Sequence, residues 1–198
     1  MQLLLSPTSP YARAIRIALI LKGLDDECTV GWVDPASDTP ELVQANPMSR
    51  VPTLLLDDGT ALTETALILQ YLDRRVPHPP LIPSANANSE LALAGRALAM
   101  LDAALWIMNN RKYLGATAND NALGERRMAT LKRTLASFKE TPPRAVGQVV
   151  GMGQLLLQVA IEYLEFRLPE LEATKTSGLG DWGKPLRKLE AFQLTEPQ

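Results

Sequence analysis

The segment "VPTLLLDDGTALTETALILQYLDRR", residues 51–75, holds two short apolar runs, a turn and a helical pattern in close succession. The residues Asp-Asp-Gly at 57–59 separate the two runs, as expected for a turn that joins two antiparallel strands. The apolar residues that follow recur at helical spacing and predict a helix from Glu64 to Arg74. This segment therefore predicts a strand hairpin closed by a helix.

The residues before this hairpin alternate between strand and helix patterns. Residues 2–5 predict a short buried strand, and residues 12–21 predict a helix that stops at the Lys-Gly pair of 22–23. The run at 28–33 predicts a second strand, and residues 34–47 predict a loop with one or two helical turns. The resulting order, β-α-β-α-β-β-α, predicts a small mixed sheet covered by helices.

The remainder of the chain has a different character. The proline-rich stretch "VPHPPLIPS", residues 76–84, predicts an extended linker. Beyond it the pattern is helical, with candidates near 86–112, 121–140, 151–168, 170–175 and 184–193. We therefore expect three parts: an α/β domain over 1–76, a linker over 77–84 and an all-α domain over 85–198.

Composition narrows the functional classes. The chain has 198 residues, of which 46% are hydrophobic and 21% charged, and its net charge is −2. The charge offers no basic footprint for nucleic acid, and the longest apolar runs are far too short to span a bilayer. A single cysteine, Cys28, fits a reducing compartment, and a single histidine, His78, argues against a metal site or a histidine-based triad. We expect a cytoplasmic protein without a metal, a nucleic-acid partner or a membrane partner.

A serine stands at the start of the first predicted helix, within "SPTSPYARAIRI", residues 6–17. Ser9 is a favoured N-cap and Pro10 suits the first helical position, so this pair has a structural explanation. The free N–H groups and the dipole of a helix N-terminus also stabilise anions, including thiolates. A hydroxyl there can donate a hydrogen bond to such an anion, and the two interpretations are compatible.

Four segments carry a resemblance to known families. The segment "SPYA", 9–12, resembles the Cys-Pro-Tyr-Cys motif of thioredoxins and glutaredoxins with both cysteines replaced, which excludes dithiol chemistry there. Residues 46–73, "NPMSRVPTLLLDDGTALTETALILQYLD", resemble the glutathione-binding half of the glutathione S-transferase family. Residues 160–172 and 183–192 resemble the sixth and last helices of its bacterial members. The resemblance implies a thioredoxin-like N-terminal domain, an all-helical C-terminal domain, glutathione as co-substrate and a homodimer.

The resemblance also implies roles for individual residues. Val51 and the cis-proline Pro52 would present backbone groups to the cysteinyl unit of glutathione. Thr65 would hold the α-carboxylate of the γ-glutamyl group and Glu64 its α-ammonium. Arg50 would reach the glycyl carboxylate as a charge-assisted donor, although a solvated loop arginine is an equal alternative.

The nucleophile in this interpretation is the thiol of glutathione. A free thiol of pKa near 8.5 is only about 3% thiolate at pH 7, and lowering that pKa by about 2 makes roughly three quarters of it thiolate. Ser9 is the expected activating residue, with Thr8 and Tyr11 as rivals in reach. An apolar electrophile would lie beside Tyr11 and three further candidate residues, Trp106, Asn110 and Tyr113.

Three functions remain open. The first is a glutathione transferase acting on small apolar electrophiles, the second a glutathione-dependent reductase, peroxidase or lyase, and the third a non-catalytic glutathione- or ligand-binding protein.

Two departures from the family pattern also stand out. Ser49 replaces a common glycine, and Gly151 and Gln154 replace a Thr-x-x-Asp capping box. We expect either a start of the helix at 151 that is weaker by about 1 kcal/mol or a compensating residue.

Overall fold

The N-terminal part of the chain folds around a four-stranded mixed sheet. The computed structural model describes residues 1–197. Its strands are β1 (Gln2–Leu5), β2 (Thr29–Trp32), β3 (Thr53–Leu55) and β4 (Ala61–Thr63). They lie in the order β2-β1-β3-β4, with β1 parallel to β2 and antiparallel to β3. The hairpin β3–β4 turns at Gly59, whose φ is +84°.

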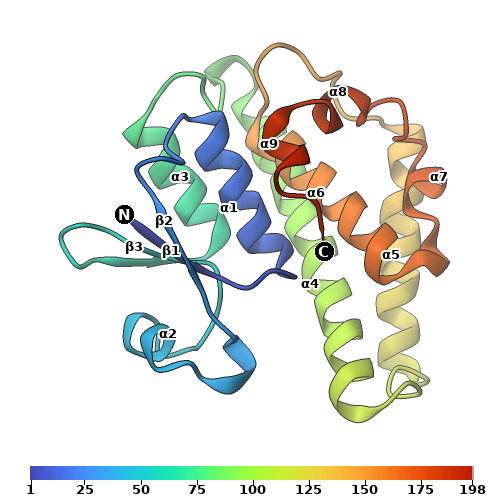
Figure 1. Ribbon diagram of the computed structural model, residues 1–198. Helices are drawn as coiled ribbons and strands as arrows, with labels where there is room; N and C mark the ends of the chain where they lie inside the picture. Colours follow the sequence, from blue (N-terminus) through green and yellow to red (C-terminus); the bar gives the residue numbers. More distant parts are fainter. Residues whose placement is uncertain (198) are drawn as a thin grey trace. The chain divides into compact units, whose positions relative to one another are not determined.

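Three helices accompany this sheet: α1 (Pro10–Leu21), α2 (Pro40–Ala45) and α3 (Thr65–Arg75). Helices α1 and α3 pack side by side, while α2 lies on the other side of the sheet (Figure 1). Leu42 of α2 packs with Leu4 and Val33 in a small buried cluster. The predicted order β-α-β-α-β-β-α is confirmed, and it is that of a thioredoxin-like domain.

The second unit contains helices and connecting loops, with no strand among its described residues. Its longer helices are α4 (Ala87–Leu114), α5 (Ala122–Glu140) and α6 (Met152–Arg167), and its shorter ones are α7 (Ala173–Ser177) and α8 (Lys184–Arg187). Single 3-10 turns precede α4 at Ser84–Asn86 and α7 at Pro169–Leu171. Helix α6 is buried on nearly all sides, as expected for the central helix of a bundle. The fold class predicted from the sequence, an α/β domain followed by helices, is therefore confirmed.

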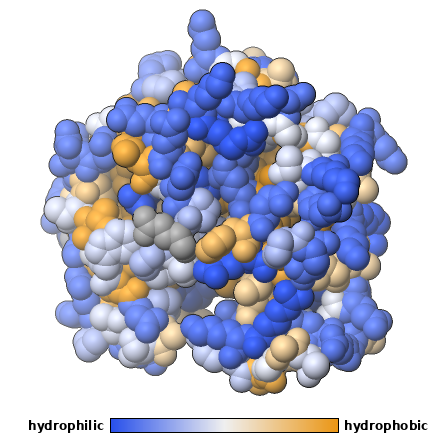
Figure 2. All heavy atoms as spheres, turned by 45° about the vertical axis from the view of Figure 1, so that its right-hand side comes forward, coloured by the Kyte–Doolittle hydropathy of each residue, from blue (hydrophilic) through white to orange (hydrophobic). Residues whose placement is uncertain are grey.

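Helix α4 corrects one expectation about apolar runs. The segment Ser84–Leu114 is long and apolar enough to cross a membrane by length and composition. Its buried residues, however, form a stripe at helical spacing that packs along α6, comprising Ala94, Ala97, Leu101, Ala104 and Ile107. That is the pattern of a core helix. The face drawn in Figure 2 carries mostly hydrophilic side chains, with hydrophobic ones in small patches.

The first turn of α6 is capped by an acidic side chain although the Thr-x-x-Asp capping box is absent. The buried carboxylate of Glu90, in α4, accepts hydrogen bonds from the backbone N–H groups of Gly153 (2.9 Å) and Gln154 (3.3 Å). These are donors that an N-cap side chain would otherwise satisfy. Gly153 permits this approach, because a Cβ there would stand 2.5 Å from the carbonyl oxygen of Glu90. The compensating residue thus comes from a different helix.

The described chain forms two compact units, and one of them includes residues from the C-terminal part. The first unit holds residues 1–83 and 149–151, together with residues from Lys188 to the end of the described chain. The last of these segments contains α9 (Glu190–Gln193), which packs on α1. There the buried Arg13 donates from Nε to the carbonyl oxygen of Thr195 at 2.6 Å. The expected helix at 184–193 is thus two short helices, and the second of them belongs to the N-terminal unit.

Candidate functional site

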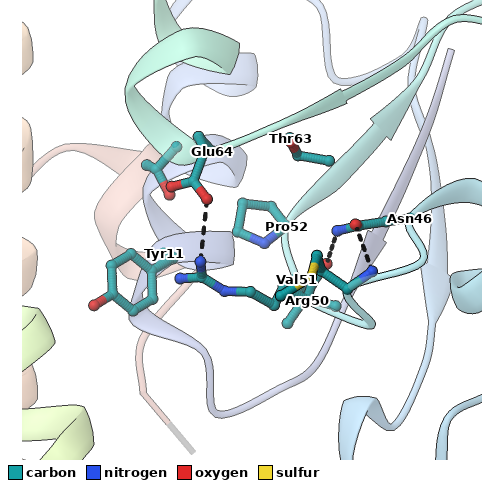
Figure 3. A pocket seen from close by; sticks show the side chains of 9 residues that line it. Tyr11, Asn46, Arg50, Val51, Pro52, Thr63 and Glu64 are labelled. Atoms are coloured by element: carbon teal, nitrogen blue, oxygen red, sulfur yellow. Dashed lines mark hydrogen bonds and ion pairs between the residues drawn. The ribbon is translucent and has the colours of Figure 1, made fainter.

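A pocket in the first unit collects residues from three separate parts of the chain. The empty space at this pocket, open solvent included, is about 410 Å³. Figure 3 shows the side chains that line it. Its lining comes from the first turn of α1, the loop between α2 and β3, and the junction of β4 with α3: Tyr11, Asn46, Met48, Arg50, Val51, Pro52, Thr63, Glu64 and Thr65. Six of these are residues to which the sequence analysis gave a role.

The loop between α2 and β3 is organised by a buried amide. Asn46 donates from Nδ2 to the carbonyl oxygen of Arg50 (3.0 Å) and to Oγ1 of Thr53 (3.2 Å), and its Oδ1 accepts from Met48 N–H (3.1 Å). Thr53 also donates to the carbonyl oxygen of Arg50 at 2.8 Å. The following Val51–Pro52 peptide bond is cis. Sequence reasoning missed Asn46 and Thr53, although the Asn-Pro pair at 46–47 was a signal for an ordered turn.

Ser49 sits in this loop with a φ of +50°, the left-handed conformation that glycine adopts without strain. We expect Ser49→Gly to be more stable than Ser49→Ala by about 1 kcal/mol, because alanine keeps the strain and also loses the hydroxyl. The wild-type hydroxyl donates to the carbonyl oxygen of Pro35 at 3.3 Å, so wild type should lie between the two variants. Urea unfolding followed by circular dichroism measures this order; equal stability of the glycine and alanine variants would contradict the strain.

The start of α3 forms the second wall of the pocket. Glu64 precedes the helix with a φ of +65°, and its side chain does not cap the helix. Instead its Oε1 lies 3.1 Å from Nη1 of Arg50, which reaches it from the opposite wall (Figure 3). Thr65 is buried in the first turn of α3, where the helix dipole favours a negatively charged group.

The first turn of α1 contributes to the site unequally. Ser9 is the N-cap, as predicted, and its Oγ accepts from Ala12 N–H at 3.2 Å. Its hydroxyl proton can still be donated, since this hydrogen bond uses only a lone pair. Among the described residues, Tyr11 lines the pocket and Ser9 does not. The choice between Ser9, Thr8 and Tyr11 therefore stays a prediction.

The remaining electrophile-site candidates lie in the helical unit, and none of them lines this pocket within the described chain. The ring of Trp106 is covered by the Arg127 guanidinium, 4.1 Å from its centroid. Asn110 donates to Asn119 Oδ1 at 3.2 Å, whereas Tyr113 is 60% exposed. Their role at an electrophile site stays a prediction.

Two other candidate chemistries find little support in residues 1–197. Cys28 is buried, and burial raises the pKa of its thiol, which makes it a poor nucleophile. Over the same residues, no group of three or more His, Cys, Asp or Glu side chains is placed to hold a metal ion.

Residues 8–75 match the model of the glutathione S-transferase N-terminal domain. The whole fold is similar to that of a glutathione S-transferase from Methylobacterium radiotolerans in complex with glutathione sulfonate, at a TM-score of 0.87 and 26% identity over 99% of this chain and 94% of that one. A stringent starvation protein A homolog of Pasteurella multocida is 40% identical over 83 residues, which are 42% of this chain and 38% of that protein. A probable glutathione S-transferase of Oryza sativa is 34% identical over 133 residues, 64% of this chain and 56% of that protein.

The match with each of these two curated relatives thus covers less than two thirds of the relative's own length. The N-terminal domain and the fold of the whole chain nevertheless agree with one family. The N-terminal domain is therefore that of the glutathione S-transferase family, and the whole chain has the fold of a bacterial glutathione S-transferase.

Proposed function

We propose that this protein is a glutathione transferase, which binds glutathione in the pocket of its N-terminal unit and stabilises the glutathione thiolate for attack on a small apolar electrophile. The observation that carries the proposal is the convergence of Arg50, Val51, Pro52, Glu64 and Thr65 on one pocket. The similar structure from Methylobacterium radiotolerans, which holds glutathione sulfonate, supports the same ligand class.

The pocket offers complementary groups for each part of the tripeptide. Thr65, at the positive end of α3, suits the α-carboxylate of the γ-glutamyl group, and the Glu64 carboxylate suits its ammonium. The backbone of Val51 suits the peptide of the cysteinyl unit, which would add to the sheet as an edge strand does. This arrangement directs the sulfur toward the first turn of α1.

The chemical step then needs a thiolate. The Ser9 hydroxyl, with the N–H groups of the α1 terminus, would stabilise the negative sulfur, while the thiol proton passes to water. The sulfur forms a bond to an electrophilic carbon, and the electron pair displaced there leaves with the leaving group or is protonated. Lowering the thiol pKa by about 2 corresponds to about 2.7 kcal/mol of stabilisation of the thiolate.

We expect calorimetry to detect glutathione binding, and the ultraviolet absorbance of the bound thiolate to titrate about 2 below the pKa of free glutathione. Ser9→Ala should restore an ordinary thiol pKa. Because alanine also removes the N-cap, at a cost of about 1 kcal/mol, Ser9→Gly serves as the control, since glycine lacks the hydroxyl but costs only about a few tenths of a kcal/mol at an N-cap. Ser9→Thr should retain the low thiol pKa.

Other outcomes point elsewhere. If Tyr11→Phe raises the thiol pKa and the Ser9 variants do not, Tyr11 is the activating residue. Binding of glutathione without any change of its thiol pKa would contradict the proposed transferase activity and favour a non-catalytic ligand-binding protein. Absence of binding would overturn the proposal.

A cytoplasmic homodimer with a small apolar electrophile as second substrate completes the proposal, on the strength of the family. Sedimentation equilibrium tests the dimer.

A further inference from the structure

An ion pair spans the proposed glutathione pocket. Arg50 Nη1 and Glu64 Oε1 lie 3.1 Å apart, and they come from opposite walls, the α2–β3 loop and the start of α3. Figure 3 shows the Arg50 side chain reaching across the pocket to Glu64, with the Tyr11 ring nearby. The guanidinium therefore holds the carboxylate to which the proposed function assigns the ligand's ammonium.

The ion pair between Arg50 and Glu64 costs little free energy to separate. The two side chains are 58% and 60% exposed, so water screens their attraction and solvates both charges when they separate. The backbone of each residue is held by hydrogen bonds, and at Glu64 the carbonyl oxygen accepts from the N–H groups of Leu67 and Ile68. The carbonyl oxygen of Arg50 accepts hydrogen bonds from Asn46 and Thr53, which fix the loop from which the side chain extends. The long Arg50 side chain can thus change partner while both walls stay in place.

We propose that Arg50 exchanges carboxylate partners when the ligand binds, and so makes the pocket selective for ligands that carry both an ammonium and a second, distant carboxylate. The inference rests on the proposed function. The ligand ammonium replaces the guanidinium at Glu64, and the released guanidinium binds the carboxylate at the other end of the ligand. A ligand without that second carboxylate still has to separate Arg50 from Glu64, and gains nothing from the released cation.

Two probes separate the two halves of this exchange: glutathione, and γ-glutamylcysteine, which lacks the glycyl carboxylate. In Arg50→Met, the competition for Glu64 is removed, so γ-glutamylcysteine should bind about twofold to fivefold more tightly than in wild type. Glutathione should bind at least about twofold more weakly, because the lost contact with its glycyl carboxylate outweighs the removed competition. Calorimetry at low salt measures both affinities.

Two controls accompany Arg50→Met. One removes an arginine outside the pocket, and the other repeats the substitution in a pocket that lacks the Glu64 carboxylate. Arg74→Met removes an exposed arginine of α3 that is not among the lining residues, and should change neither affinity. In a Glu64→Gln background, Arg50→Met should no longer improve the binding of γ-glutamylcysteine, because no ion pair remains to be broken.

The failures are distinguishable. If wild type binds glutathione, but Arg50→Met weakens both probes equally or leaves both unchanged, the exchange is wrong and the proposed function stands. If wild type binds neither probe, the proposed function is overturned, and the exchange falls with it.

Discussion

Replacing Glu90 with alanine is expected to lower the free energy of unfolding by about 3 kcal/mol. The buried carboxylate satisfies two backbone N–H groups at the start of α6, those of Gly153 and Gln154. Alanine would remove the carboxylate that accepts from both donors in a buried region, and the loss of a buried acceptor costs about 1–3 kcal/mol for each hydrogen bond. The negative charge at the positive end of the helix is also lost.

Chemical unfolding followed by far-ultraviolet circular dichroism measures this loss. Glu90→Gln keeps one acceptor oxygen and should lose less than half as much. The matched control is Glu125→Ala, which removes an exposed acid from the first turn of α5 and should change stability by less than about 0.5 kcal/mol. Should Glu90→Ala prove no less stable than Glu125→Ala, α6 does not depend on this cap.

The ends of α1 and the cap of α6 show what a sequence can and cannot predict. Ser9-Pro10 at the start of α1 and Lys22-Gly23 at its end are signals between neighbouring residues, and the structure has the helix between them. Glu90 accepts a hydrogen bond from the N–H group of Gly153, which lies 63 residues further along the chain. A helix pattern cannot single it out, because nothing in its own helix requires a buried acid there.

The candidate site divides in the same way. Family motifs pointed to Arg50, Val51, Pro52, Glu64 and Thr65, and the fold brings all five to one pocket. The motifs did not give the contacts that these residues make with each other, such as the pair between Arg50 and Glu64. The same limit applies to the α2–β3 loop, where the hydrogen bonds of a buried amide depend on side-chain geometry.

The segment expected to be a linker, 77–84, makes contacts that its composition does not predict. Its composition predicts an extended connection, but its first half is bonded to the N-terminal unit through a lysine. The Lys22 ammonium, whose side chain is fully buried, donates to Asp73 Oδ1 and to the carbonyl oxygens of Val76 and Pro79. Asp73 also accepts from the N–H groups of Leu81 and Ile82. A lysine at the end of an amphipathic helix is ordinarily solvated, so the sequence alone favours an exposed side chain.

Replacing Asp73 with alanine is therefore expected to lower the free energy of unfolding by about 3–5 kcal/mol, the largest effect that we predict. The substitution leaves the buried ammonium with two neutral carbonyl acceptors and removes the acceptor for two backbone N–H groups. Lys22→Met should cost less, because Asp73 keeps both of those donors and is partly accessible to water.

An exposed ion pair of the same unit provides the matched control for this prediction. Arg75 Nη2 and Glu27 Oε2 lie 2.9 Å apart, with side chains that are 37% and 56% exposed, and Arg75→Ala should have little effect on stability. Chemical unfolding of the three variants, followed by far-ultraviolet circular dichroism, should rank Asp73→Ala as the least stable, then Lys22→Met, with Arg75→Ala close to wild type. The reverse order for the two buried variants would mean that the loss of the ammonium, and not its isolation, limits stability.

The contact between Lys22 and Asp73 also joins two helices of the candidate site. Because Lys22 closes α1 and Asp73 lies in α3, it fixes the two helices whose first turns carry Ser9, Tyr11, Glu64 and Thr65. A loss of this size would therefore weaken the framework of the glutathione pocket as well as the connection that follows it.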